Sequence, residues 1–329
     1  MSSRAEAIVL VTPRSYRDAD PEVQARLESS VAEVRYNERG RALGSEELAA
    51  ELGDVDGVIA GLDRFDVAAI AAAPRLRVIS RYGVGIDNVD LAAARRAGVV
   101  VTNTPNANAV SVAEFTLGLM LALLRRLAVL DRRVREGDWT PERGAELAGS
   151  VVGVLGLGRI GAAVAVRANA LGAEVLAHDP YREPGFGREV GAELLELSEL
   201  LPRARVLSLH VPLTEETRDL VDAELLAALP HGALLVNTAR GELVVEDDLA
   251  AALDAGSLAG AALDSLRTEP PPPDHPLLHR DDVVITPHAA AQTTEARAAM
   301  ARAATEDLLA VLEGEQPRHP VAAPAGATR

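Results

Sequence analysis

The chain has 329 residues, enough for two domains that each bury a core, and a net charge of −16, which makes nucleic acid and anionic membranes poor partners. Cysteine is absent, which excludes disulfides, thiolate metal sites and cysteine nucleophiles. Lysine is absent too, since all 33 residues counted as Lys+Arg are arginine, so acid–base chemistry must fall to His, Asp, Glu or Tyr.

The first part of the chain, from about residue 7 to residue 104, alternates between strand-like and helix-like patterns. Such alternation predicts a parallel sheet with helices beside it. The expected strands are 7–12, 32–35, 56–60, 76–80 and 99–102, and the expected helices include 21–30, 45–52 and 91–97. The loop Tyr82-Gly83-Val84-Gly85 could expose backbone N–H groups to an anion, although an ordinary tight turn explains it equally well.

A long helix is expected next. Ser111 and Glu114 have the spacing of a capping box, which predicts a helix that begins there and reaches about Arg135. It contains the longest apolar run of the chain, Phe115–Leu124, which is too short to span a bilayer. The first residues of the chain lack the apolar core of a signal peptide. We therefore expect a cytoplasmic protein without a membrane partner.

A second alternating series fills residues 150–289, and it opens on a glycine-rich turn. The expected strands are 151–155, 173–177, 205–209, 233–236, 258–263 and 282–285. After the first of them, Gly156, Gly158 and Gly161 match the pattern G-x-G-x-x-G. They would allow a tight turn, leave room for a pyrophosphate and let helix and strand pack closely. The N-terminus of the following helix would offer N–H groups to the phosphates.

Asp179 follows the next strand, where a carboxylate can bind both ribose hydroxyls and would repel a 2′-phosphate. A strand, a glycine turn, a helix, a second strand and an acid in this order favour NAD as the cofactor, rather than NADP or a merely tight turn. Because this pattern begins near residue 150, the cofactor domain is predicted to be inserted after a separate first domain.

The sequence thus predicts an α/β protein of two Rossmann-like, doubly wound parallel-sheet domains. The discontinuous substrate domain would comprise residues 1–104 and 290–329, including a last helix at about 293–313, and the NAD-binding domain residues 105–289. We expect the active site in the cleft between them, at the carboxyl ends of strands. The Pro/Ala-rich residues 319–329 are expected to be disordered.

Three polar residues follow strands of the second series: Arg240, Glu269 and His288. Histidine can take the hydroxyl proton as a hydride leaves a carbinol carbon. A carboxylate can orient its ring, and arginine can bind a substrate carboxylate through two hydrogen bonds. Alone, each has a simpler explanation: a core or surface histidine, a solvated glutamate, an arginine paired with Glu242. Together, after a dinucleotide-binding pattern, they predict a hydride-transfer site.

Three other histidines, His275, His279 and His319, show no metal-ligand spacing. We expect them to be solvated, and we expect no metal.

Several segments, taken together and in order, resemble the D-isomer-specific 2-hydroxyacid dehydrogenases, especially the branch around D-3-phosphoglycerate dehydrogenase. The resemblance extends from about residue 50 to about residue 315. The segments that carry it are Arg81–Asp90, Asn103–Pro105, Gly156–Gly161, Leu209–Thr214, Asn237–Gly241, Ala262–Asp264 with Glu269-Pro270, and Thr286–His288.

The resemblance implies hydride transfer between NAD and a small D-2-hydroxy acid, with Arg240, Glu269 and His288 as catalytic residues. It implies that the N–H groups of Val84 and Gly85 hold the substrate carboxylate beside Arg240. Beyond the glycines and Asp179, the cofactor contacts that it implies are Arg159, Ile160, His210, Pro212, Thr238 and Asp264. Of these, Arg159 and Ile160 would meet the pyrophosphate, and Asp264 the nicotinamide carboxamide. A homodimer through the helix near residues 111–128 is also implied.

The substrate stays open at this stage. Phosphoglycerate dehydrogenases commonly carry a substrate-binding arginine where this chain reads Ile59-Ala60-Gly61-Leu62, and Arg64 and Arg81 are near that place but not at it. Glyoxylate, hydroxypyruvate and lactate-type acids therefore stand beside 3-phosphoglycerate. A NAD-sensing, corepressor-like binding protein is the alternative from another functional class, and the complete Arg/Glu/His set favours the enzyme.

Overall fold

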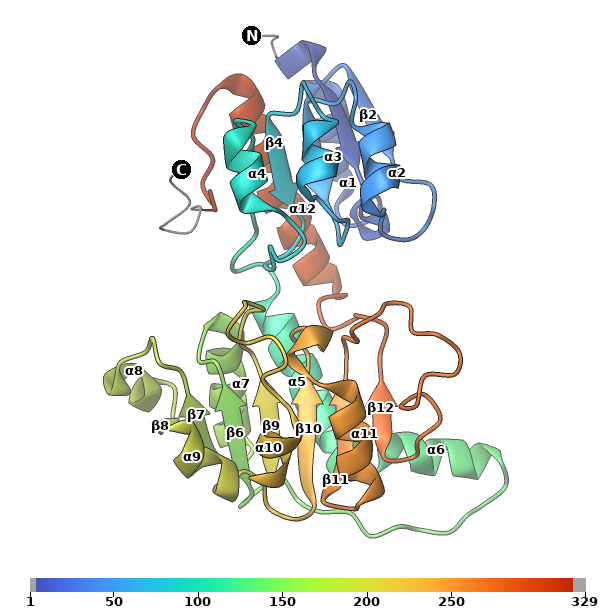
Figure 1. The fold of residues 1–329 in the computed structure, drawn as a ribbon, viewed down its shortest axis with the longest axis vertical. Coiled ribbons are helices and arrows are strands. Elements are labelled where there is room, and N and C mark those ends of the chain that lie inside the picture. Colours follow the sequence, from blue (N-terminus) through green and yellow to red (C-terminus); the bar gives the residue numbers. More distant parts are fainter. Residues whose placement is uncertain (1–3, 322–329) are drawn as a thin grey trace. The chain divides into compact units, whose positions relative to one another are not determined.

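Two separate parallel sheets organise the chain, of which the computed structural model describes residues 4–321. Contacts divide the chain into two units, Met1–Asn108 with Gln292–Arg329 and Ala109–Ala291 (Figure 1). Each unit has its own sheet with helices beside it, so the predicted α/β fold class is confirmed. The separate substrate and cofactor roles of the two domains, and the cleft between them, stay predictions.

The first unit has a five-stranded sheet in the order β2-β1-β3-β4-β5, with all strands parallel. Its strands are β1 Ile8–Val11, β2 Glu33–Tyr36, β3 Gly57–Ala60, β4 Val78–Arg81 and β5 Val100–Thr102. Its helices are η1 Arg4–Glu6, η2 Arg14–Tyr16, α1 Pro21–Ser30, α2 Ser45–Glu51, α3 Val67–Ala71, α4 Leu91–Arg96 and α12 Thr294–Glu313.

Alternate residues of the central strands face different helices, as the two-residue period of a strand requires. On one face, Gly57 of β3 packs against α12, where a Cβ would lie 3.4 Å from Leu308, and the hydroxyl of Ser80 donates to the carbonyl of Ala304 at 2.8 Å. On the other face, Val58 and Ile79 join the core that α2, α3 and α4 cover. The helix α12 thus belongs to this sheet, although it lies at the far end of the sequence.

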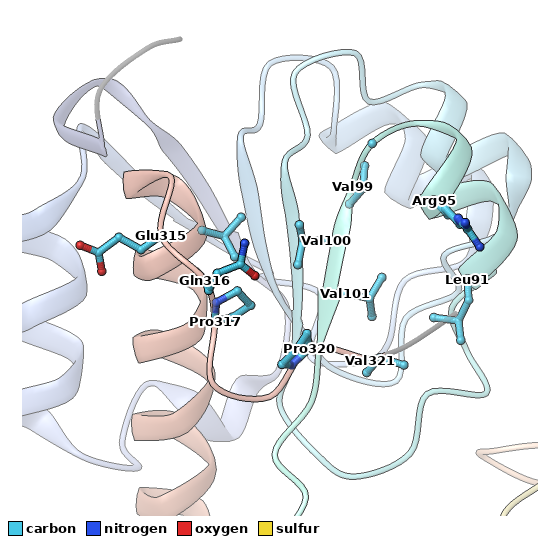
Figure 2. A pocket seen from close by; sticks show the side chains of 12 residues that line it. Leu91, Arg95, Val99, Val100, Val101, Glu315, Gln316, Pro317, Pro320 and Val321 are labelled. Atoms are coloured by element: carbon cyan, nitrogen blue, oxygen red, sulfur yellow. The ribbon is translucent and has the colours of Figure 1, made fainter. Parts of the chain in front are cut away.

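After α12, the chain lies beside the edge strand β5. The N–H of Val321 donates to the carbonyl of Val101 at 2.8 Å, and Thr102 bridges Pro320 in an antiparallel sense. The prediction of disorder from residue 319 is therefore wrong for residues 319–321, and residues 322–329 lie outside the described part. A surface cavity of about 510 Å³ is lined by this segment, β5 and α4 (Figure 2). None of the predicted site residues lines it.

The second unit has a seven-stranded parallel sheet in the order β12-β11-β10-β9-β6-β7-β8. Its strands are β6 Val151–Leu155, β7 Glu174–His178, β8 Glu193–Leu194, β9 Val206–Leu209, β10 Ala233–Asn237, β11 Leu258–Leu263 and β12 Val283–Ile285. Its helices are α5 Ala109–Leu124, α6 Leu127–Arg135, α7 Arg159–Ala170, α8 Pro184–Glu189, α9 Leu197–Leu200, η3 Leu201–Arg203, α10 Ala223–Ala227, η4 Gly241–Leu243 and α11 Glu246–Asp254.

Two apolar cores lie on the two faces of this sheet. Leu234 and Val236 of β10 join the core that includes α5 and α7, whereas Leu235 joins the core that includes α10 and α11. Both faces of the central strands are buried, which is why they read as continuous apolar runs rather than alternating ones. The short edge strand β8 was not predicted.

The predicted single helix from Ser111 to about Arg135 is wrong in two respects. The helix α5 begins at Ala109, so Ser111 lies buried inside its first turn and is not a cap. The helix then breaks before α6 at Arg126, whose φ is +52°. The break has a tertiary cause, because the N–H of Ala145 donates to the carbonyl of Leu124 at 2.9 Å. Within residues 4–321, no helix is long and apolar enough to cross a bilayer.

Candidate active site

The glycine turn between β6 and α7 is built from three glycines with different surroundings. Gly156 has a φ of +89°, and a Cβ there would lie 2.7 Å from the carbonyl oxygen of His210. A Cβ on Gly161 would lie 2.0 Å from the carbonyl oxygen of Gly156. Around Gly158, by contrast, a Cβ would meet no protein atom within 4 Å. The fold therefore requires the first and third glycines, while the second borders open space at the N-terminus of α7.

This arrangement fits a dinucleotide. The helix α7 begins at Arg159 and Ile160, so the backbone N–H groups of its first turn point towards this space. The helix dipole favours an anion at this end. Open space beside Gly158 is what a pyrophosphate needs in order to approach the backbone closely.

Asp179 follows β7 and contacts the glycine turn directly. Its Oδ2 accepts the N–H of Leu157 at 2.8 Å, and its Oδ1 accepts the N–H of Tyr181 at 3.0 Å. The half-buried carboxylate therefore shapes the turn, and each oxygen has the lone pairs to accept a further hydrogen bond.

The other predicted cofactor contacts lie where neighbouring strands end. His210 follows β9, its Nε2 lies 2.8 Å from the hydroxyl of Ser208, and burial lowers its pKa to about 3. The ring is thus neutral at physiological pH. Pro212 follows in the same loop and is exposed. Thr238 follows β10, where its hydroxyl lies 2.9 Å from that of Thr116 on α5.

Arg240, Glu269 and His288 follow β10, β11 and β12, which are neighbours in the sheet. Because the carboxyl ends of parallel strands lie at the same edge of a sheet, these three residues lie at one edge of the second unit's sheet. The Nδ1 of His288 lies 3.0 Å from Oε2 and 3.3 Å from Oε1 of Glu269. The structure therefore brings the predicted imidazole and carboxylate into direct contact.

Backbone hydrogen bonds fix the conformation of the chain at His288, and thus the direction of its imidazole ring. Its φ is +51°, and its N–H donates to the carbonyls of Asp264 and Thr286, both at 3.0 Å. The side chain of Asp264 is only 1% exposed, and it accepts the hydroxyl of Thr286 and the N–H groups of Ala289 and Ala290. Asp264 therefore holds the turn that presents His288.

Glu269 stays ionised because of its neighbours. Burial alone would raise its pKa, but the hydrogen bond and charge of His288, the N–H of Leu266 at 3.1 Å and the charge of Arg240 together hold that pKa below the ordinary glutamate value. Arg240 is therefore close enough to Glu269 to affect its ionisation. The Glu269–Pro270 peptide bond is cis.

The loop that carries Arg240 is closed by Asn237, a buried polar residue at the end of β10. Its Nδ2 donates to the carbonyl of Arg240 at 2.7 Å, and its Oδ1 accepts the N–H of Ala239 at 3.0 Å. Next to it, Gly241 touches the neighbouring loop so closely that a Cβ would lie 2.0 Å from the carbonyl carbon of Leu266. The loops that carry Arg240 and Glu269 are thus packed backbone to backbone.

In the first unit, the loop with Val84 and Gly85 follows β4. Gly83 has a φ of +152°, and a Cβ there would lie 3.2 Å from a guanidinium nitrogen of the buried Arg81. The carbonyl of Val84 accepts from Nδ2 of Asn103 at 2.8 Å, and that of Gly83 accepts the N–H of Thr104 at 3.0 Å. The loop therefore packs against the side chain of Arg81, and the segment after β5 donates hydrogen bonds to its carbonyl groups.

Of the three histidines expected to be solvated, His275 is shielded from solvent, whereas the side chain of His319 is 32% exposed. The Nε2 of His275 lies 3.1 Å from Oε2 of Glu246, with both side chains mostly buried. The Nδ1 of His319 lies 3.0 Å from Oδ2 of the buried Asp307. The prediction for His275 failed because its partner Glu246 begins a helix in a separate segment of the chain. Among residues 4–321, no group of three or more His, Asp or Glu side chains is arranged to hold a metal ion.

Three residues that hold the site together were not predicted from the sequence: Asn237, Thr116 and Glu246. Asn237 had a signal, since it is a polar residue at the end of the apolar run Ala233–Val236. Thr116 and Glu246 had none, because their contacts connect positions far apart in the sequence.

The chain is similar to known proteins in both sequence and fold. The family model described as D-isomer specific 2-hydroxyacid dehydrogenase, NAD binding domain, matches residues 117–290. A glyoxylate reductase of Korarchaeum cryptofilum is 42% identical over 271 residues, which cover 80% of this chain and 82% of that protein. A D-3-phosphoglycerate dehydrogenase of Archaeoglobus fulgidus is 40% identical over 285 residues, which cover 86% of this chain but only 54% of that protein.

A solved structure agrees in fold over nearly the whole chain. D-Lactate dehydrogenase from Aquifex aeolicus, complexed with NAD and lactic acid, superposes with a TM-score of 0.82 at 29% identity. The match covers 96% of this chain and 100% of that one.

Proposed function

This chain belongs to the D-isomer specific 2-hydroxyacid dehydrogenase family, and from that premise we propose that it reduces a small, unphosphorylated 2-keto acid, with glyoxylate as the first candidate. It is an NAD-dependent oxidoreductase that acts on 2-hydroxy acids. The observation that carries the proposed mechanism is the contact of 3.0 Å between Nδ1 of His288 and Oε2 of Glu269.

In the proposed mechanism, His288 is the proton donor during reduction and the proton acceptor during oxidation. Its Nδ1 faces Glu269, which leaves Nε2 for the oxygen of the substrate carbonyl. Glu269 fixes the orientation of the ring and stabilises its protonated form. Arg240 binds the substrate carboxylate and polarises the neighbouring carbonyl. When NADH is bound, it supplies the hydride.

The cofactor is proposed to lie along the glycine turn. The N–H groups of Arg159 and Ile160 would bind the pyrophosphate beside Gly158, and Asp179 would bind the ribose hydroxyls. His210, Pro212, Thr238 and Asp264 would line the part of the cofactor nearer to His288. These roles are supported by the open space at Gly158 and by the positions of the side chains at strand ends.

The N–H groups of Val84 and Gly85 are proposed to bind the substrate carboxylate. Support comes from the loop itself, since its carbonyl groups are used within the fold and Arg81 lies beneath it. Replacing Val84 by proline removes one N–H donor. The KM for the keto acid should then rise while NADH binding stays unchanged. An unchanged KM would show that the N–H of Val84 does not bind the substrate carboxylate.

An unphosphorylated substrate is favoured by the residues that follow β3. Leu62 is an exposed apolar side chain there, and Arg64 is 76% exposed with its Nε 3.6 Å from Oδ2 of Asp66. Two glyoxylate reductases and a D-lactate dehydrogenase match over most of their own length, whereas this chain spans little more than half of two phosphoglycerate dehydrogenases.

A homodimer is proposed from an exposed apolar surface on α5, α6 and the segment that follows. Val110, Leu121, Leu127, Val134 and Trp139 are all exposed, with Trp139 at 85%. Exposed apolar side chains on consecutive elements are typical of a subunit interface. Light scattering should give twice the monomer mass, and Leu121→Arg should lower it. A monomeric wild type would refute the proposal.

A cytoplasmic location is proposed because the reaction draws on a continuous supply of NADH. Fractionation of cells that express the tagged protein tests this location.

The function is tested by measuring NADH oxidation with glyoxylate, hydroxypyruvate, pyruvate and 3-phosphohydroxypyruvate. We expect the highest kcat/KM with one of the first three. Highest activity with the phosphorylated acid would refute the proposed substrate class. Tight NADH binding without turnover of any acid would instead indicate a NAD-sensing binding protein.

A further inference from the structure

Glu246, the first residue of α11, contacts both sides of the loop that carries Glu269. Its Oε1 accepts the N–H of Arg267 at 2.9 Å, and its Oε2 lies 3.1 Å from Nε2 of His275. Arg267 lies shortly before Glu269 in the chain, and His275 lies shortly after it. One carboxylate on a helix therefore connects the two ends of this loop.

The pair of Glu246 and His275 is shielded and fully oriented. Their side chains are 14% and 11% exposed. The Nδ1 of His275 accepts the N–H of Leu277 at 3.3 Å, so Nε2 carries the proton that is donated to Glu246. Leu277 itself is buried in the core of the second unit. The ring is thus held between a core residue and the N-terminus of a helix.

The sequence of the loop explains why it needs such an anchor. Pro270 to Pro273 lie between Glu269 and His275, and four consecutive prolines have no backbone N–H to donate. This stretch cannot be held by a ladder of backbone hydrogen bonds. The side chain of Glu246 accepts a hydrogen bond at each end of the stretch, from Arg267 and from His275. At the first end, Nε of Arg267 also donates to the carbonyl of Val244 at 2.7 Å.

We propose that Glu246 and His275 are positioning residues, which hold the loop from Arg267 to His275 so that the carboxylate of Glu269 meets the imidazole of His288. The inference rests on the proposed dehydrogenase function, because it assigns these residues to the geometry of its proton-transfer pair. Neither residue touches the reacting atoms. They act through Glu269, whose Oε1 also accepts the N–H of Leu266 next to Arg267.

The proposal predicts a change in ionisation that a purely structural contact would not produce. The pKa of Glu269 is held down by His288 and, more weakly, by Leu266 and Arg240. If the loop moves away, Glu269 loses these partners and its pKa rises. The acidic limb of the pH profile of kcat/KM should then shift to higher pH.

The test compares Glu246→Ala and His275→Ala with the control Asp254→Asn in the full chain. Asp254 is the last residue of α11, and it pairs with Arg280 rather than with the loop near Glu269. We expect kcat for the best 2-keto acid to fall about tenfold in both test variants, with NADH affinity unchanged. The double variant should be no worse than Glu246→Ala alone, since both residues act through one contact. Asp254→Asn should behave like the wild type.

Amide hydrogen exchange of the peptide that contains Arg267 gives a second measurement, which needs no turnover. Exchange should be faster in both test variants than in Asp254→Asn. Wild-type kcat, an unshifted acidic limb and unchanged exchange would overturn the inference while leaving the dehydrogenase in place. If the wild type turned over no 2-keto acid, the proposed function would fail, and the exchange result would still decide whether Glu246 and His275 hold the loop.

Discussion

The imidazole Nδ1 of His288 lies 3.0 Å from Oε2 of Glu269, although the two residues follow different strands. The contact results from strand order, because β11 and β12 are parallel neighbours whose carboxyl ends lie at one edge of the sheet. It is local to one unit, and Arg240 at the end of the next strand contributes its charge.

Glu269→Gln should alter the pH dependence of stability. The pKa of Glu269 lies below its ordinary value of 4.5 in the folded protein, so its ionised form stabilises the native state above that pH. This contribution is lost as the pH falls through the lower, folded pKa. The difference in Tm between the wild type and Glu269→Gln should therefore be largest near neutral pH and shrink in acid. A difference that stays constant across this range would contradict the assignment.

Arg240→Lys should impair use of the substrate carboxylate. Lysine keeps the charge but cannot make two parallel hydrogen bonds to a carboxylate. Losing one charge-assisted hydrogen bond costs about 2 kcal/mol, so kcat/KM for the keto acid should fall roughly thirtyfold. The matched control is Arg64→Lys, an exposed arginine in the first unit, which should change little. Equal effects of the two substitutions would argue against carboxylate binding by Arg240.

The bounds of the strands were more predictable than the break in the long helix. The strands β6, β10 and β11 are apolar runs that end at glycine or polar residues, so their bounds agree closely with the prediction. Arg240, Glu269 and His288 were predicted as site residues because each follows a strand-like run. The break at Arg126 was not predictable, since it depends on Ala145 reaching the carbonyl of Leu124.

The contacts that support the candidate site could not be predicted from the sequence. Glu246 and His275 lie in separate segments of the chain, and only the packing of α11 beside the loop brings them together. Asp264 was predicted as a cofactor contact from the resemblance, whereas its several hydrogen bonds to the turn at His288 could not be read from sequence spacing.

Asp179→Ala should relax the preference for NADH over NADPH. The variant lacks the carboxylate that would repel a 2′-phosphate, so the ratio of kcat/KM for the two cofactors should fall at least about tenfold. Because Asp179 also accepts the N–H of Leu157, Asp179→Asn is the control that keeps an acceptor for the turn. An unchanged ratio of kcat/KM for NADH and NADPH in both variants would show that Asp179 does not bind the ribose.

Two glycines of the same turn should respond differently to alanine. In Gly158→Ala, the added Cβ meets no protein atom within 4 Å, so Tm should stay unchanged while NADH affinity falls at least about tenfold. In Gly161→Ala, the Cβ would lie 2.0 Å from the carbonyl oxygen of Gly156, and the protein should lose about 3 kcal/mol of stability. Thermal unfolding and NADH titration of both variants check this. Unimpaired NADH binding by Gly158→Ala would contradict a pyrophosphate site there.

The most direct test of the account is a single-turnover measurement with the wild type and His288→Ala. Each protein is loaded with NADH, whose binding is measured first, and is then mixed with the best 2-keto acid of the panel. We predict equal NADH binding and NADH oxidation at least about a thousandfold slower in His288→Ala. Oxidation at the wild-type rate in the variant would show that the proton does not pass through His288, and would contradict the mechanism.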